Sequence, residues 1–167
     1  PLLSRGHVRR VLVVCPASLV DQWHDRLYTM FDIRLMPYQT DADTRTANFW
    51  AMQDQVVASL QTLRARNPER MRRFYEADPW DVLIVDEAHH LNADEKSGAT
   101  LGYELVREMV DRNHADSVVF FTGTPHRGKD YGFLSLLRLL RPETFHPDRP
   151  MRDQLPHLRD VMIRNNK

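Results

Sequence analysis

Short apolar runs, separated by segments with helical periodicity, are the feature that most constrains the fold of this chain. Five such runs occur, at residues 11–15, 33–36, 55–60, 82–85 and 118–121. Runs with apolar residues at consecutive positions are typical of strands buried on both faces, as in a parallel sheet covered by helices. We therefore predict an α/β domain with a mostly parallel sheet.

Three segments between and after these runs carry apolar residues at helical spacing. The first is residues 19–31, which is introduced by Ser18-x-x-Asp21, a sequence with the form of a capping box. Residues 101–110 and 133–140 show the same periodicity, and the second segment ends before a proline. Trp23 lies on the apolar stripe of the first helix, so we assign it to the core rather than to base stacking.

Charge and cysteine content limit which partners and which cellular compartment are expected. The 23 basic residues equal the 23 acidic ones, so net charge indicates neither nucleic acid nor membrane as a partner. Cys15 is the only cysteine, and no stretch has the length of a membrane span or the form of a signal peptide, so we expect a cytoplasmic protein. The sequence has no initiator Met and enters a strand almost at once, and we expect it to be cut from a longer protein.

The stretch "DVLIVDEAHHL" places two acids directly after a buried strand. Asp86 is costly to desolvate unless a cation or hydrogen bonds hold it, and the neighbouring Glu87 adds repulsion. A bound Mg²⁺ would relieve both, with Asp86 on the metal side and Glu87 as the base that polarises water. The alternative is a solvated turn, because acids favour a helix N-terminus.

Three motifs in order resemble those of the superfamily-two helicases, within them the Swi/Snf-type DNA translocases and their RapA-like bacterial members. "VLVVCPASLVDQW" resembles motif Ia, "DEAHHL" motif II, and "TGTPHRGKDYGFLSLLRLLRPE" motif III with its helix. A fourth segment, "QVVASLQTL", looks like the motif that follows Ia in the family. The resemblance implies a three-layer RecA-like domain of the P-loop NTPase class, with ATP and Mg²⁺ as cofactors.

The resemblance also implies roles for individual residues. Asp86 would coordinate Mg²⁺ through water, Glu87 would activate the attacking water, and His89 would link this site to motif III. The motif III residues that would couple hydrolysis to domain movement are Thr122, Gly123 and Thr124, and those that would contact nucleic acid are Pro16, Ala17, Ser18 and Ser59. His90 has no assigned role.

The implied partners are double-stranded DNA and a second RecA-like domain of the parent chain. Residues 1–145 would form part of the first RecA-like domain, carrying motifs Ia to III, and residues 146–167 an irregular segment that leads toward the second. The acting protein would be found in the cytoplasm, at the bacterial nucleoid. In isolation, the chain is expected to be inactive.

The sequence departs from the family where ATP should bind. The phosphate loop, G-x-x-x-x-G-K-[ST], should precede motif Ia by tens of residues, and the chain begins only about ten residues before it. A near-match occurs at residues 123–130, but Pro125 removes an N–H and Asp130 would repel phosphate, so we do not expect it to cradle a nucleotide. Without the phosphate-loop strand, the run at 118–121 should have an unpaired edge.

Other interpretations remain open. The chain could be a noncatalytic nucleic-acid-binding module derived from a helicase domain, or, more remotely, a metal-dependent phosphohydrolase using Asp86, Glu87, His89 and His90. The basic segment 64–73 could bind phosphates or form a solvated helix face paired with acids of the same helix.

Overall fold

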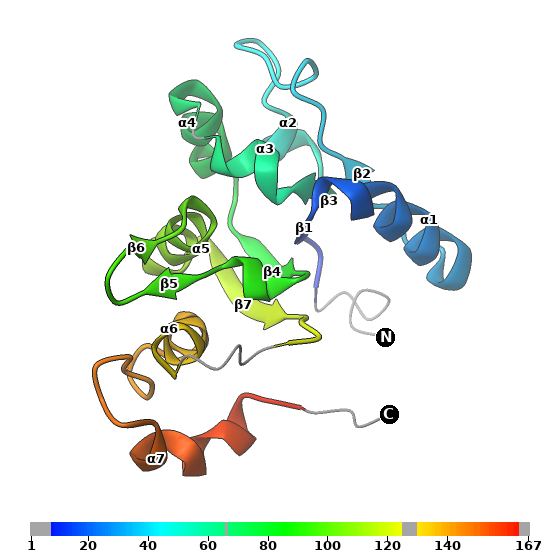
Figure 1. The fold of residues 1–167 in the computed structure, drawn as a ribbon. Coiled ribbons are helices and arrows are strands. Elements are labelled where there is room, and N and C mark those ends of the chain that lie inside the picture. Colours follow the sequence, from blue (N-terminus) through cyan, green and yellow to red (C-terminus); the bar gives the residue numbers. More distant parts are fainter. Residues whose placement is uncertain (1–7, 66, 125–129, 164–167) are drawn as a thin grey trace.

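A five-stranded parallel sheet forms the centre of the molecule in the computed structural model, which describes residues 8–65, 67–124 and 130–163 (Figure 1). Its order is β2 (Met36–Pro37), β3 (Gln55–Ser59), β1 (Val11–Cys15), β4 (Trp80–Val85) and β7 (Ala115–Phe120). Each neighbouring pair is parallel. The predicted α/β class and parallel sheet are therefore confirmed.

Helices cover both faces of this sheet. Leu12 and Val14 of β1 face a large core, whereas Val11 and Val13 face a smaller one, because side chains alternate along a strand. The smaller core is covered by α1 (Val20–Phe31). The larger core is covered by α2 (Phe49–Met52), α3 (Leu60–Arg64), α4 (Pro68–Glu76), α5 (Leu101–Asp111) and α6 (Asp130–Leu140). This is the three-layer arrangement expected from the sequence.

Short elements complete the described part of the chain. They are the 3-10 helices η1 (Ala17–Leu19), η2 (Ala88–His90) and η3 (Leu155–Asp160), the hairpin strands β5 (Ala93–Asp94) and β6 (Gly98–Ala99), and the helix α7 (Met151–Gln154). Beyond residue 145, α7 and η3 pack against α6 through a small cluster around the buried Phe145. The expectation that residues 146–167 lead toward a second domain stays a prediction.

Two local predictions are wrong. Ser18 does not cap α1, because a 3-10 turn beginning after Pro16 shifts the first residue of the helix to Val20, and Leu19 occupies the cap position without a side-chain bond. The run at 33–36 forms a strand only at its end, where Met36 and Pro37 pair with β3. The helices predicted at 19–31, 101–110 and 133–140 are confirmed as α1, α5 and α6.

A buried ion pair holds the long segment between β2 and α2 against α4. Arg73 Nε donates to Asp43 Oδ1 at 2.7 Å, and Arg73 Nη2 donates to Asp43 Oδ2 at 3.0 Å. The Tyr38 hydroxyl donates to the same carboxylate at 3.0 Å. The Asp43 side chain has no exposed area and that of Arg73 is 10% exposed, so each charge depends on the other for its stabilisation.

The two edges of the sheet differ. On one side the sheet ends in β2, which has only two residues and contains Pro37. On the other side it ends in β7, a six-residue strand that pairs with β4 alone among the described strands. Next to this edge, the Val119 side chain is 39% exposed and that of Phe121 is 48% exposed. The predicted unpaired edge at 118–121 is present in the described part of the chain.

Cys15, at the end of β1, is expected to be chemically inert while the protein is folded. It has no exposed area, and burial, followed by the charge of Asp86, raises the pKa of its thiol to about 12. Because the thiolate is the nucleophile, native protein at pH 8 should react with DTNB more than about a hundredfold more slowly than protein unfolded in guanidinium chloride. Equal rates in the two states would show that Cys15 is accessible.

Candidate active site

Four strands end at the same edge of the sheet, and the candidate residues follow these ends. In the parallel register, Cys15 is opposite Ser59, Val14 is opposite Val85, and Val85 is opposite Phe120. Ligands of open α/β sheets bind beyond the carboxyl ends of the strands. The register therefore brings the predicted motifs to one side of the domain, although they are far apart in the sequence.

The turn after β4 holds Glu87 in an unusual backbone conformation. Its φ of 50° and ψ of 45° lie in the left-handed region, which few residues other than glycine adopt and which costs of order 1–3 kcal/mol. Backbone bonds fix the turn on both sides: Asp86 N–H donates to Val14 O at 2.8 Å, and Ala88 N–H donates to Phe121 O at 2.9 Å. The neighbouring strands therefore determine where the two acids lie.

Both oxygens of the Asp86 carboxylate accept a hydrogen bond from the protein. Oδ1 accepts from the Glu87 backbone N–H at 2.8 Å, and Oδ2 accepts from the Trp23 indole N–H at 2.8 Å. A carboxylate oxygen has two acceptor positions, so each oxygen keeps one position for a further donor or a cation. The orientation of the carboxylate is fixed by α1 on one side and by the turn on the other.

His89 connects Glu87 with the end of β7. Its Nδ1 lies 3.0 Å from Glu87 Oε2 and 3.2 Å from Thr122 Oγ1. Because an ionised carboxylate can only accept, the Glu87 contact requires the proton on Nδ1, and Thr122 Oγ1 then acts as a second acceptor for that proton. The Glu87 side chain is 39% exposed, so the carboxylate is held by the ring and still reaches solvent.

The residues after β7 continue this arrangement. Thr122 Oγ1 also accepts from the Thr124 backbone N–H at 3.2 Å. A Cβ placed on Gly123 would meet no atom of the described residues within 4 Å. The near-match to a phosphate loop at 123–130 runs through residues 125–129, which lie outside the described part of the chain.

The predicted nucleic-acid residues lie beside this site, after β1 and β3. Ala17 and Ser18 are exposed, and Ala17 N–H donates to Gln61 Oε1 at 3.1 Å. Ser59 is the N-cap of α3: its hydroxyl accepts from Thr62 N–H at 3.0 Å and lies 2.7 Å from Thr62 Oγ1. The two predicted contact regions are therefore joined by a direct hydrogen bond.

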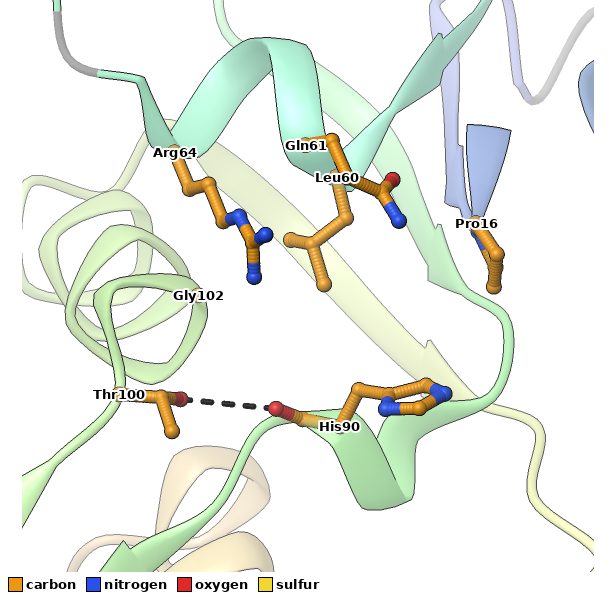
Figure 2. Close-up of a pocket in the computed structure, with 7 residues that line it drawn as sticks. All are labelled: Pro16, Leu60, Gln61, Arg64, His90, Thr100 and Gly102. Carbon is orange, nitrogen blue, oxygen red and sulfur yellow. Dashed lines mark hydrogen bonds between the residues drawn. The ribbon is translucent and has the colours of Figure 1, made fainter. Parts of the chain in front are cut away.

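A pocket of about 100 Å³ opens between these loops and motif II (Figure 2). Arg64 and Leu60 of α3 point into it from one side, and His90 and Thr100 line the other, where the Thr100 hydroxyl donates to His90 O at 3.5 Å. Pro16 closes one end. The exposed guanidinium of Arg64 makes this a place where an anion can be held.

Most of the described arginines in the segment 64–73 are engaged within the protein. Arg72 pairs with Glu69 and Glu76, the two acids proposed for a solvated helix face. Arg70 donates to Thr62 O at 2.7 Å, and Arg73 is the partner of Asp43. Among the described arginines of this segment, Arg64 is the one best placed to contact a partner.

Comparisons with known proteins identify the family of this chain. The model of the SNF2-related domain matches residues 3–156. This chain belongs to the SNF2-related family. The RNA polymerase-associated protein RapA of Yersinia pseudotuberculosis is 32% identical over 148 residues, which cover 86% of this chain and 15% of that protein. RapA of Yersinia enterocolitica is 31% identical over the same lengths. The chain thus spans about 15% of the length of these curated relatives.

Solved structures of similar fold come from the same group. The Sulfolobus solfataricus SWI2/SNF2 ATPase core in complex with dsDNA superposes with a TM-score of 0.64 at 19% identity, covering 86% of this chain and 27% of that one. The structure of the same core domain alone gives 0.61 at 21% identity, covering 84% and 26%. The RecA-like fold predicted for this SNF2-related domain is confirmed. In its described part, no helix has the length and apolarity needed to cross a membrane.

The Asp86 carboxylate is the kind of oxygen donor that magnesium takes from proteins. Within residues 8–65, 67–124 and 130–163, no three His, Cys, Asp or Glu side chains are grouped so that they could hold a metal ion. Mg²⁺ is usually bound by one or two carboxylates together with water and phosphate oxygens. Asp86, fixed at a strand end with a free acceptor position on each oxygen, suits that role.

Two residues at the site were not predicted for it. Trp23 was assigned to the core from its periodicity, and it does pack on the smaller core, but its indole N–H reaches Asp86. Gln61, which joins α3 to the loop after β1, was not considered at all. Both residues lie in the first turn of a helix that follows a strand. Such turns lie at the ligand-binding edge of the sheet, so this position is the signal that could have identified them.

Proposed function

We propose that this SNF2-related domain is part of an ATP-dependent DNA translocase that couples ATP hydrolysis to movement along duplex DNA. In this role Asp86 faces the magnesium side of the nucleotide, Glu87 accepts a proton from the attacking water, and His89 links Glu87 to Thr122 after β7. The domain acts together with a second RecA-like domain of a longer protein, and the isolated chain is inactive.

The hydrogen-bonded series from Glu87 through His89 to Thr122 is the observation that carries this proposal. It joins the end of β4 to the end of β7 by side chains whose bonds lie at 3.0 and 3.2 Å. A movement of Glu87 would therefore be passed by His89 to the Thr122 hydroxyl. From Thr122 it would reach the Thr124 backbone N–H, which donates to the same hydroxyl. Such a series supports the coupling of hydrolysis to movement, because it connects Glu87, the proposed base, with the end of a second strand.

Asp86 and Glu87 can take different parts in the proposed hydrolysis of ATP. When bound, Mg²⁺ neutralises charge on phosphate oxygens and orients them. Glu87 is held by His89 and remains partly exposed, so its carboxylate can receive a proton from water as a general base. The Asp86 carboxylate is held in one orientation by its two donors, so it can face a cation without a change of rotamer.

The surface beside the acids supports duplex DNA as the partner. Ala17 and Ser18 are exposed, and the pocket next to them carries Arg64 and His90. Phosphate contacts of this kind position a duplex without reading its sequence. The Sulfolobus solfataricus neighbour was solved in complex with dsDNA, which supports the same partner for this domain.

The test uses the full-length protein encoded by the reading frame that contains this sequence. Mg²⁺-dependent ATP hydrolysis should rise when duplex DNA is added, and the protein should displace a third strand from a triplex as it moves. Duplex binding without ATP hydrolysis would favour the noncatalytic binding module instead. Calorimetric titration of the isolated chain with Mg²⁺-ATP should give no binding at millimolar nucleotide.

Arg64 is expected to contribute one phosphate contact. Arg64 is exposed, and its side chain lines the pocket of Figure 2. Arg64→Gln should weaken duplex binding by the full-length protein equally for all sequences and reduce the slope of log affinity against log salt by about one. Arg72→Gln is the matched control, because its guanidinium is occupied by Glu69 and Glu76. Equal slopes for Arg64→Gln and the parent would exclude the contact.

A further inference from the structure

Trp23 stands out among the tryptophans of the chain. All three lie in the described part, and Trp50 and Trp80 are fully buried with indole N–H groups that have no hydrogen-bond partner among the described residues. Trp23 is only partly buried, and its N–H donates to Asp86 Oδ2 at 2.8 Å. The one indole with a polar partner is therefore bound to the acid on the magnesium side of the proposed site.

Packing fixes the position of the Trp23 ring. The side chain contributes to the smaller core between α1 and the sheet. On its outer side, the ring centroid lies 6.2 Å from that of Phe121, the residue that follows β7. A tryptophan side chain has only two rotatable torsions and a large contact area. The donor is consequently held in place before any ligand arrives.

The bond also completes the fixation of Asp86. The Glu87 N–H holds Oδ1 and the Trp23 N–H holds Oδ2, so rotation of the carboxylate about its own axis would break two bonds at once. The free acceptor position on each oxygen is then directed to a constant place. Partners that orient a metal-binding carboxylate typically change metal affinity by 10- to 100-fold when they are removed.

We propose that Trp23 is a positioning residue of this ATPase site, whose indole N–H orients the Asp86 carboxylate toward Mg²⁺. This inference rests on the proposed function, because it assigns Mg²⁺ to Asp86. The residue acts through Asp86 and does not itself touch substrate. Trp23 also lies on the helix that follows Pro16–Ser18, so it connects the loop proposed to contact DNA with the acid proposed to face the metal.

The hydrogen bond itself is tested on the isolated chain, without nucleotide. Trp23→Phe keeps most of the ring packing and removes the N–H donor. In urea unfolding, Trp23→Phe should lower the equilibrium constant for folding about tenfold more in the parent chain than in an Asp86→Asn background, because bonds to charged acceptors are the stronger ones. The same loss in both backgrounds would show that the indole contributes packing alone and would overturn the proposal.

The positioning role is tested on the full-length protein. Mg²⁺ is titrated at fixed fluorescent ATP analogue, and nucleotide binding is read by fluorescence, independent of hydrolysis. Trp23→Phe should raise the Mg²⁺ concentration at half-saturation about tenfold. Trp50→Phe is the matched control: it shortens a buried indole that has no hydrogen bond and should leave Mg²⁺ dependence unchanged.

The outcomes separate this inference from the proposed function. Parent protein that neither binds nor hydrolyses Mg²⁺-ATP would overturn both. An active parent protein whose Mg²⁺ dependence is the same in Trp23→Phe would overturn the role of Trp23 and leave the proposed function standing. A tenfold shift in Trp23→Phe, absent in Trp50→Phe, would support the positioning role.

Discussion

Glu87→Gln in the full-length protein is expected to lower ATP hydrolysis by at least about a hundredfold, the usual contribution of a positioned general base. Glutamine has nearly the shape of glutamate, and its amide oxygen can still accept from His89 Nδ1, which lies 3.0 Å from Glu87 Oε2. The amide cannot take up a proton from water at neutral pH. Hydrolysis should therefore fall while Mg²⁺-ATP binding remains near that of the parent protein.

Steady-state hydrolysis and equilibrium binding of a fluorescent nucleotide, measured on the same preparations, check this result. Glu95→Gln provides the control, since it makes the same substitution at an exposed residue of the β5–β6 hairpin. Full hydrolysis by Glu87→Gln would remove Glu87 as the base. Loss of both binding and hydrolysis would indicate that Glu87 acts on the nucleotide rather than on water.

Asp43→Ala is expected to destabilise the isolated chain by about 3–5 kcal/mol, the effect typical of removing one partner from a buried ion pair. The substitution leaves the guanidinium of Arg73, 10% exposed, without its carboxylate. It also removes the acceptor of the Tyr38 hydroxyl. Urea unfolding followed by circular dichroism measures the loss, and Asp41→Ala, two positions away at an exposed residue, should change stability by less than about 0.5 kcal/mol.

The stabilisation by Asp43 should depend on pH. Burial alone would raise the pKa of its carboxyl, but hydrogen bonds from Arg73 and Tyr38 outweigh burial, so the pKa is lowered. A lowered folded-state pKa stabilises the protein above the unfolded value of about 3.9, and this contribution is lost as pH falls below it. The stability difference between parent and Asp43→Ala should thus shrink below about pH 4. A difference independent of pH would mean that the carboxylate is not the stabilising group.

The sheet could be predicted from sequence because its strands are buried on both faces. The run at 11–15 is apolar at each position and coincides with β1. The run at 33–36 was misplaced because only its last residue pairs with β3, and burial of Leu35 comes from packing rather than from strand pairing. Helix α4 was expected only as one of two readings of the basic segment 64–73, although Asn67 and Pro68 carry the cap and first-position signals of a helix N-terminus.

The sequence predicted which residues of the candidate site lie close together, but not every residue that contacts them. The family resemblance implied that His89 would link the acids after β4 to the motif III residues after β7, and His89 does lie beside Thr122. The roles of these residues stay predictions. Periodicity identified the face of α1 that carries Trp23. It did not give the position of Trp23 along the helix relative to the edge of the sheet, because that position depends on where the preceding 3-10 turn ends.

The two edges of the sheet differ in how well they could pair with a further strand. Beside β2, a further strand would meet a two-residue partner whose Pro37 has no N–H to offer. Beside β7, six residues present backbone groups and the exposed Val119. Among the described residues, β7 therefore has an edge to which an additional strand could pair without disturbing an existing pair, and β7 lies next to β4, after which the two acids follow. A polypeptide that adds a strand beside β7 would lie close to the candidate site after β4 and β7.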